Sequence, residues 1–249
     1  MSRIIVIGEC RLDVEYAADF RSAPAGARPS GHMTNIALRL AEKGYNVVFL
    51  TEAAVDSVGD TVIDYLASHG VDVSYADRYT DGLTPLAAIC PGMTPTLYTS
   101  YPATDGFDII WPRLDDEEDI VVFGDYMTLS KRWSHNYLNF MSHVVAKGCR
   151  TLYVPGDISW RVSRVTKVMP QVFENLEMAT AVMLDPATCS YYFGTDSPEQ
   201  ALNKTVGYYC PTILFAPPGS TSPLEVGKQL PASLSSLVAD IMARKCHLI

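Results

Sequence analysis

Three residues near the start of the sequence, Asp13, Gly31 and Asn35, are of types that suit the binding of hydroxyl groups. A carboxylate accepts hydrogen bonds, an amide donates and accepts them, and a glycine allows close approach of the backbone to a ligand. A sugar, whose adjacent hydroxyls donate and accept, would suit such a set. Taken singly, each has an ordinary interpretation: Asp13 as a turn residue, Asn35 on a solvated helix face and Gly31 as the entry to a helix.

Metal and disulfide chemistry have little support. The five histidines form no His-x-x-x-His pair and have no cysteine or aspartate neighbour at metal spacing, so no metal site is predicted. The six cysteines are far apart and include no Cys-x-x-Cys pair, so we interpret them as reduced, mostly buried thiols. Five consecutive carboxylates at residues 115–119 are interpreted as a solvated turn rather than a cation site.

The candidate residues must be positioned by strands and helices, which the sequence predicts in alternation. Apolar runs of strand length alternate with amphipathic segments of helix length, which is typical of a parallel sheet with helices on both faces. A single α/β domain over residues 1–249 is expected. Strands are predicted at residues 3–7, 46–50, 120–123, 151–154, 181–184 and 212–215.

Helices are predicted where apolar residues recur at helical spacing. The clearest covers residues 33–41 and stops at Gly44, and a second covers 57–69 and stops at Gly70. Later helices are predicted over residues 130–146, 197–209 and 233–244.

Two stretches interrupt the alternation. Residues 83–101 predict two β segments around a turn at 91–95, and residues from about 10 to 17 could also be extended. Together they predict a small lid sheet, inserted in the domain and standing off the main sheet.

The N-terminal part of the sequence resembles the PfkB or ribokinase-like sugar kinases in the order and spacing of its residues. The similarity is good over residues 3–101 and weaker over 119–216. It is carried by the strand at 4–7 with Gly8 and Glu9, then Asp13, Gly31, Asn35, Ile36, Ala37, Gly44, Asp56, Gly59, the segment 66–73 and Thr84.

This resemblance implies a three-layer α/β/α ribokinase-like, or Rossmann-like, fold with a mostly parallel sheet and a small β lid. It also implies that Asp13, Gly31 and Asn35 bind a sugar. Two departures could narrow or reshape that site: residues 30–35 read Ser-Gly-His-Met-Thr-Asn, with a larger side chain at the second small position, and Ala54 replaces a glycine.

The segment that implies catalysis in this family is missing. Family members carry Asp-Thr-x-Gly-Ala-Gly-Asp ahead of a late helix, where backbone N–H groups form an anion hole and the last aspartate is the base. The nearest candidate is residues 227–233, with Ser233 at the position of the base. A serine without a nearby base cannot accept a proton near pH 7, and Pro231 removes a backbone donor, so we interpret Ser233 as a helix N-cap.

Other features of the nucleotide side are also weak. An Asn-x-x-Glu segment, associated in the family with magnesium and phosphate, would fall at residues 185–188, where the glutamate is absent and Asp185 alone is weak evidence. Residues 216–221 match the family's Thr-x-Gly loop poorly. The chain is also shorter than is usual in the family, so part of the adenine pocket is expected to be missing.

These observations lead to one hypothesis and two alternatives. The leading hypothesis is a carbohydrate-kinase-like protein, a pseudokinase, whose sugar side persists while ATP-dependent phosphoryl transfer is reduced or lost. The first alternative is an active sugar or nucleoside kinase, a transferase using ATP and Mg²⁺ at a rebuilt nucleotide site. The second is a scaffold or regulatory protein that forms a homodimer through the lid, where Leu97, Tyr98 and Tyr101 offer apolar contacts.

Charge limits the partners that are expected. Lysine and arginine number 19 against 28 acidic residues, and the net charge of −9 opposes attraction to nucleic acid or anionic lipid. The first apolar run is too short for a signal peptide or a membrane span, so a cytoplasmic protein is expected. The expected partner is therefore a small sugar or sugar-like molecule.

Overall fold

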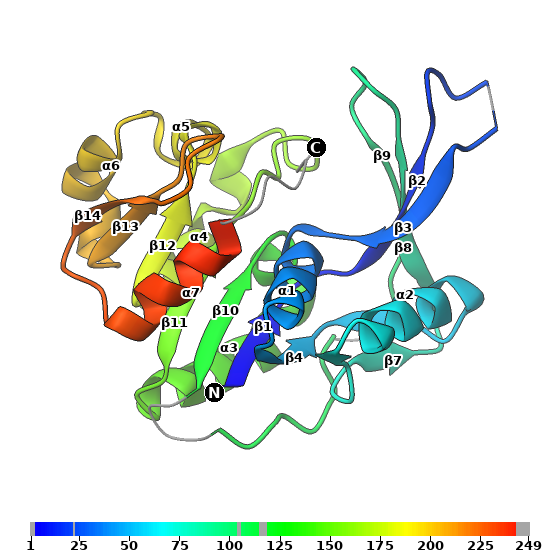
Figure 1. Ribbon diagram of the computed structural model, residues 1–249, viewed down its shortest axis with the longest axis horizontal. Coiled ribbons are helices and arrows are strands. Elements are labelled where there is room, and N and C mark those ends of the chain that lie inside the picture. The colour runs from blue at the N-terminus through cyan, green and yellow to red at the C-terminus, as the bar shows by residue number, and fades with distance from the viewer. Residues whose placement is uncertain (1–2, 22, 104–105, 115–118, 243–249) are drawn as a thin grey trace.

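The computed structural model describes residues 3–21, 23–103, 106–114 and 119–242. At its centre is an eight-stranded sheet in which all neighbouring strands are parallel except the last pair, β13 and β14 (Figure 1). In spatial order the strands are β14 (Leu224–Gly227), β13 (Thr212–Phe215), β12 (Ala181–Leu184), β11 (Arg150–Val154), β10 (Ile120–Gly124), β1 (Arg3–Ile7), β4 (Asn46–Leu50) and β6 (Val71–Asp72).

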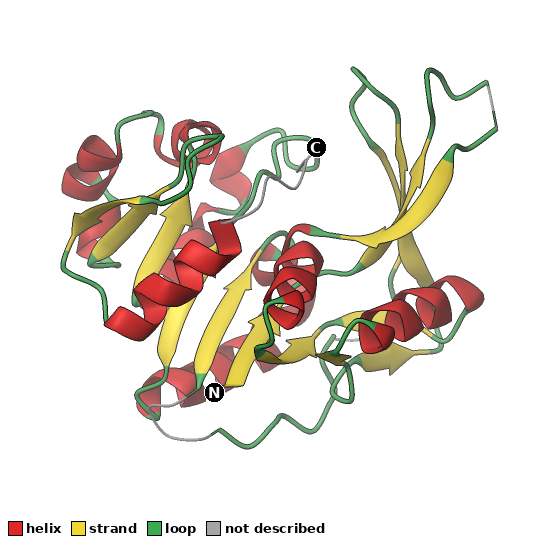
Figure 2. Ribbon diagram, in the orientation of Figure 1, coloured by secondary structure: helices red, strands yellow, loops and turns green. Residues whose placement is uncertain are grey.

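Helices cover both faces of this sheet, as Figure 2 shows. Strand β1 explains why both are needed: Ile4 and Val6 contribute to one core and Ile5 and Ile7 to the other, and all four are fully buried. The first core is completed by α1 (His32–Glu42), α2 (Ser57–Ser68) and α7 (Ala232–Met242), and the second by α3 (Lys131–Ala146), α4 (Met169–Glu177), α5 (Pro186–Phe193) and α6 (Pro198–Lys204).

A separate four-stranded sheet rises beyond the carboxyl ends of β1 and β4, at the upper right of Figure 1. We call this sheet the lid. Its strands lie in the order β3 (Gly26–Ser30), β2 (Arg11–Glu15), β8 (Leu83–Ile89) and β9 (Thr96–Ser100). A short parallel pair, β5 (Glu52–Ala54) and β7 (Asp77–Tyr79), lies at its base.

The predicted fold class is confirmed: the molecule is a three-layer α/β structure with a mostly parallel sheet and a small β lid. The sequence did not predict β3, β14, α4 or α5. Pro29 in β3 argues against a strand but is tolerated because β3 is an edge strand. The helix predicted over 197–209 ends at Lys204 and gives way to a 3₁₀ turn at Val206–Tyr208.

The C-terminal helix, predicted to reach residue 244, is described as far as Met242, and most of the acidic run at 115–119 lies outside the described residues. Within the part of the chain that the structure describes, no helix is both long and apolar enough to cross a membrane.

Candidate functional site

Three buried carboxylates follow three neighbouring strands of the main sheet. Glu9 follows β1, Glu52 follows β4 and Asp125 follows β10, and each is at most 6% exposed. Because the carboxyl ends of parallel strands meet at one edge, these groups form the floor of the region under the lid. The word cleft is used below only as the name of this region, the carboxyl edge of the sheet beside the lid; in open α/β sheets, ligands bind outside this edge.

Asp125 and Glu9 are joined through the backbone. The N–H of Glu9 donates to the Asp125 carboxylate at 3.0 Å, as does the N–H of Met127. Asp125 has a φ of 56°, the left-handed conformation that non-glycine residues seldom adopt. Burial and the nearby Glu9 carboxylate raise the pKa of Asp125. The backbone of Asp125 is thus held in an unusual conformation, and the surroundings of its carboxyl group favour the protonated form.

The side chain of Glu9 is held by two partners from distant parts of the chain. Arg161 donates to it at 2.6 Å and the Tyr101 hydroxyl donates at 2.7 Å. The Arg161 guanidinium also lies 3.7 Å from the centre of the Tyr126 ring. Burial, followed by the Glu9 charge, raises the pKa of Tyr101, so its hydroxyl remains a donor. A buried ion pair with an aromatic cover therefore occupies the floor of the cleft.

Asp13 lies on the lid strand β2 and is 4% exposed. Its carboxylate accepts from Nε of Arg11 at 2.7 Å, and the Arg11 guanidinium lies 5.6 Å from the Trp160 ring centre. Asp13 also lines a hollow of about 120 Å³ on the lid, and Glu15 and Arg28 are among the other residues that line it. The carboxylate is therefore already paired with an arginine, and a hydroxyl ligand would share it.

Gly31 and Asn35 lie at the start of α1. Gly31 has a φ of 137°, and a Cβ there would be 2.5 Å from the Glu9 carbonyl oxygen, so glycine is required for α1 to approach the end of β1. The half-buried Asn35 amide forms no hydrogen bond with any residue that the structure describes. Asn35 can therefore bind a ligand, whereas Gly31 has a packing role. No hydrogen bond joins Asp13 to Asn35 within the described chain.

The two residues after Gly31 reshape the floor of the cleft. Met33 is fully buried, and a Cβ on Gly8 would be 2.3 Å from the Met33 Cβ, so its side chain fills the space at the end of β1. The His32 ring packs against Gly156, and its buried Nε2 has no hydrogen-bond partner among the described residues. Burial lowers the pKa of His32 to about 4, so the imidazole is neutral at pH 7.

Asp56, Gly59 and Thr84 connect α2 to the lid. Asp56 is the N-cap of α2, where it accepts from the Gly59 N–H at 2.6 Å and from both the N–H and the hydroxyl of Thr84 at 2.9 Å. Burial would raise the pKa of Asp56, but these hydrogen bonds hold it below its usual value. Asp56, Gly59 and Thr84, which contribute to the family resemblance, therefore have a structural role.

Ser233 lies at the opposite edge of the sheet from the cleft. Strand β14 runs antiparallel to β13, so it ends at the amino edge, and α7 begins there five residues later. Ser233 is the second residue of α7 and accepts from Arg150, the first residue of β11, at 2.6 Å. The structure therefore does not bring Ser233 to the position expected for a base, and it is not an N-cap.

Asp185 follows β12 at the same edge as the cleft, but its carboxylate caps α5 in a reciprocal capping box with Thr188. Among the described residues, no group of three histidine, cysteine or acidic side chains could hold a metal ion.

Sequence reasoning named Glu9 only among the residues that carry the family resemblance, and it missed Asp125 and Arg161. The signal for Asp125 was weak: Gly124-Asp125 at the end of an apolar strand. Arg161 gave no signal, because it lies 152 residues from its partner Glu9.

Comparisons with known proteins show a similarity in fold. No family model and no curated protein matches the sequence. Solved structures do match: a PfkB protein from Polaromonas sp. JS666 has a TM-score of 0.72 and 15% identity over 92% of this chain and 80% of that one. Fructokinase from Vibrio cholerae O395, with fructose, ADP and calcium bound, has a TM-score of 0.73 and 15% identity, covering 91% of this chain and 74% of its own.

Aminoimidazole riboside kinase from Salmonella enterica, in complex with aminoimidazole riboside and an ATP analogue, has a TM-score of 0.75. It is 14% identical, and the match covers 98% of this chain and 86% of the kinase. The chain therefore has the PfkB or ribokinase-like fold.

Proposed function

We propose that this protein binds a sugar or sugar-like ligand in the cleft and has lost efficient ATP-dependent phosphoryl transfer. The observation that carries the proposal is the direction of α7. Its N-terminus lies at the amino edge of the sheet, beside Arg150, whereas Glu9 and Asp125 lie at the carboxyl edge. The helix that would supply an anion hole for the transferred phosphoryl group therefore faces away from the ligand.

The described residues do not fit a magnesium–nucleotide complex. Asp185 is committed to its capping box, and Ser233 is bound to Arg150. No triad of metal-ligating side chains is present in the described chain.

Several observations support the binding of a polyhydroxylated ligand. The Asn35 amide is without a hydrogen bond in the described ranges and lies on α1, the helix that follows lid strand β3 in the chain. Asp13 borders a hollow on the lid, and an ionised carboxylate that accepts from Arg11 can still accept from a hydroxyl. The fructokinase and the riboside kinase with this fold were solved with a sugar and a riboside bound.

The test is a thermal-shift screen against sugars and ribosides, including fructose and aminoimidazole riboside, followed by calorimetry on the hits. We expect a hit whose affinity falls about tenfold in Asn35→Ala and in Asp13→Ala, since each removes a polar contact. Asp64→Ala, an exposed aspartate on α2, is the matched control and should bind like the parent protein. A coupled assay for ADP release with the same ligands should show no appreciable turnover.

Two results would overturn the proposal in different ways. Turnover of a sugar that disappears in Asp13→Ala would make the protein an active kinase that uses ATP and Mg²⁺. No stabilisation by any sugar at millimolar concentration would favour the scaffold.

One observation supports the scaffold as a second candidate. Tyr98 of β9 is 59% exposed on the lid, where a partner could cover it. Tyr101 is not available in the same way, because its hydroxyl is bound to Glu9. If the lid forms a homodimer, Tyr98→Ser should shift the molecule towards the monomer in size-exclusion chromatography with light scattering.

A further inference from the structure

The segment that follows β11 in the chain connects the main sheet to the lid. Trp160 lies in this segment, and the centre of its half-buried ring lies 5.6 Å from the guanidinium carbon of Arg11 on lid strand β2. A guanidinium at this distance is attracted to the face of an aromatic ring. Arg11 in turn pairs with Asp13, two residues further along the same face of β2. A residue outside the lid therefore contacts the partner of the carboxylate that we propose binds the ligand.

Arg11 holds one oxygen of the Asp13 carboxylate and leaves the other largely open. Nε of Arg11 donates to Oδ1 at 2.7 Å, whereas Nη2 lies 3.4 Å from Oδ2, near the upper limit of hydrogen-bonding distance. Both side chains are largely buried, with 14% of the Arg11 side chain and 6% of the Asp13 side chain exposed. Burial strengthens the short ionic hydrogen bond, so it fixes the orientation of the carboxylate. Oδ2 can still accept a hydrogen bond from a ligand hydroxyl.

Trp160 is held in place by its own segment of the chain. Its Nε1–H donates to the carbonyl oxygen of Asp157 at 3.2 Å, and the Asp157 carboxylate accepts from the N–H of Ser159 at 2.8 Å. The next residue, Arg161, is anchored by its ion pair with Glu9 on the floor of the cleft. The indole ring therefore has a fixed position against the arginine of the lid.

We propose that Trp160 and Arg11 are positioning residues for the ligand. Trp160 holds the Arg11 guanidinium, and Arg11 holds the Asp13 carboxylate in the orientation in which it accepts from a ligand hydroxyl. This inference rests on the proposed function of the cleft. Because Arg11 and Asp13 belong to the lid and Trp160 does not, the carboxylate is held in this way only while β2 is in contact with Trp160. Contact of the lid with Trp160 and binding of the ligand should therefore favour each other.

Isothermal titration calorimetry with the sugars and ribosides of the screen, fructose and aminoimidazole riboside among them, tests the proposal. Trp160→Ala should weaken binding about tenfold, whereas Trp160→Phe, which keeps an aromatic face, should stay within about twofold of the parent protein. Arg11→Ala should also weaken binding about tenfold, because the Asp13 carboxylate loses its fixed orientation. Tyr208→Ala removes a ring that is 79% exposed in the 3₁₀ turn after α6, and this matched control should bind like the parent.

The double variant distinguishes positioning from a general effect on the segment around Trp160. If Trp160 acts through Arg11, Trp160→Ala/Arg11→Ala should bind no more weakly than Arg11→Ala alone. Independent effects would instead multiply to about a hundredfold, and this result would overturn the proposal. Tighter binding in Arg11→Ala would also overturn it, since Arg11 would then compete with the ligand for Asp13.

A measurement without ligand tests the contact between Trp160 and the lid. Hydrogen exchange in peptides that cover β2 should be faster in Trp160→Ala than in the parent protein or in Tyr208→Ala. Unchanged exchange would show that Trp160 does not hold the lid and would contradict the proposal. Circular dichroism of each variant confirms that a loss of binding is not a loss of folding.

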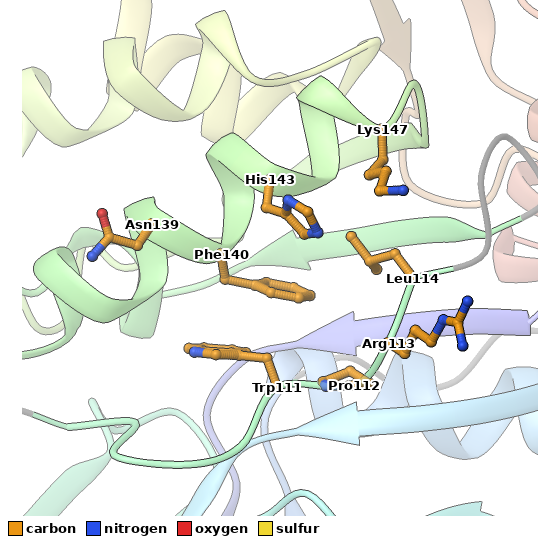
Figure 3. Close-up of a pocket in the computed structure, with 8 residues that line it drawn as sticks. All are labelled: Trp111, Pro112, Arg113, Leu114, Asn139, Phe140, His143 and Lys147. Atoms are coloured by element: carbon orange, nitrogen blue, oxygen red, sulfur yellow. The ribbon is translucent and has the colours of Figure 1, made fainter.

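The outcomes separate this inference from the proposed function. The absence of binding by every sugar and riboside would overturn both, whereas binding that Trp160→Ala leaves unchanged would overturn this inference alone. A probe in the hollow of about 590 Å³ between residues 111–114 and the second half of α3 (Figure 3) would give that second result. Lys147 lines this hollow and lies three residues before the start of β11, at the opposite edge of the main sheet from the lid.

Discussion

At the scale of single residues, the cleft floor depends on the pairing of Glu9 with Arg161. Both side chains are at most 10% exposed and their charged atoms are 2.6 Å apart. A buried ion pair contributes little net free energy relative to apolar residues, but the removal of one partner leaves the other charge buried and alone. Substitution of one partner alone should therefore lower the stability of the protein more than replacement of the whole pair by apolar residues.

Arg161→Ala should lower the free energy of unfolding by about 3 kcal/mol, because Glu9 keeps only its hydrogen bond from Tyr101. Urea denaturation measures the change. The exposed Arg164 provides the control, since Arg164→Ala should change stability by no more than about 0.5 kcal/mol. Equal effects of the two substitutions would show that the Glu9 ion pair is not formed in solution.

Asp125 should give stability a distinct pH dependence. Burial and Glu9 raise its pKa in the folded protein, so the folded state holds this proton more tightly than the unfolded state. Its contribution is fully present below about pH 4, the usual pKa of aspartate, and is lost as the pH rises through the raised value.

Urea denaturation between pH 3 and pH 9 should therefore show a stability difference between the parent protein and Asp125→Asn that falls as the pH rises. Asparagine tolerates the left-handed backbone of this position. Asp64→Asn, which changes an exposed aspartate, should run parallel to the parent. A difference that grows with pH would show that the pKa of Asp125 is lowered instead.

Residue types alone predicted part of this site. Asp13, Gly31 and Asn35 were predicted as candidates from their residue types and the family resemblance, whereas Glu9 entered only as part of that resemblance. The partners of Glu9 were not predicted, because Arg161 and Tyr101 lie 152 and 92 residues away along the chain. Arg11, the partner of Asp13, lies only two residues away on the same strand.

At the scale of elements, α2 packs closely against the base of the lid at Gly59. A Cβ on Gly59 would be 2.2 Å from the Ala54 carbonyl oxygen and 2.7 Å from the Thr84 hydroxyl. The first contact is with backbone, which cannot move without displacing β5. The glycine is therefore required by packing.

Gly59→Ala should lower the free energy of unfolding by about 1–3 kcal/mol, the usual cost of overpacking. Gly26→Ala is the matched control, because a Cβ at Gly26 would meet no atom within 4 Å. Thermal melts followed by circular dichroism measure both. If Gly59→Ala is no less stable than Gly26→Ala, α2 does not pack against Ala54 as described.

Elements with a strong pattern of apolar residues were predicted almost to the residue. Short elements whose formation depends on neighbouring elements were not. The apolar strands β1, β4, β12 and β13 match their predicted ranges because they are buried on both faces. Strand β14 is an exposed edge strand of four residues. Helix α5 begins with a capping box at residues 185–188, where the sequence offered only weak evidence for a metal site. Such short elements are fixed by their neighbours.

At the scale of the whole molecule, the start of α7 and the cleft lie at opposite edges of the main sheet. The resemblance in sequence put Ser233 at the position that the base has in the family but could not show to which edge of the sheet the last helix returns. That depends on β14, the antiparallel strand that brings the chain back to the amino edge.

Ser233→Asp should therefore give no kinase activity with any sugar, since the new carboxylate would lie beside Arg150 and not in the cleft. Its effect on stability should stay within about 1 kcal/mol, as for a partly exposed ion pair. A coupled ADP-release assay and a urea titration measure the two. Appreciable turnover would show that α7 begins at the carboxyl edge.

The central position of β1 has a consequence for synthesis of the chain. This strand is made before β4 and β10, yet it lies between them in the sheet, and Ile4 pairs with both Val47 and Ile120. On the ribosome, β1 remains an unprotected sheet edge until β10 has emerged, a condition that favours association between nascent chains. A chaperone that binds extended apolar segments should therefore act on this protein before its second half is made.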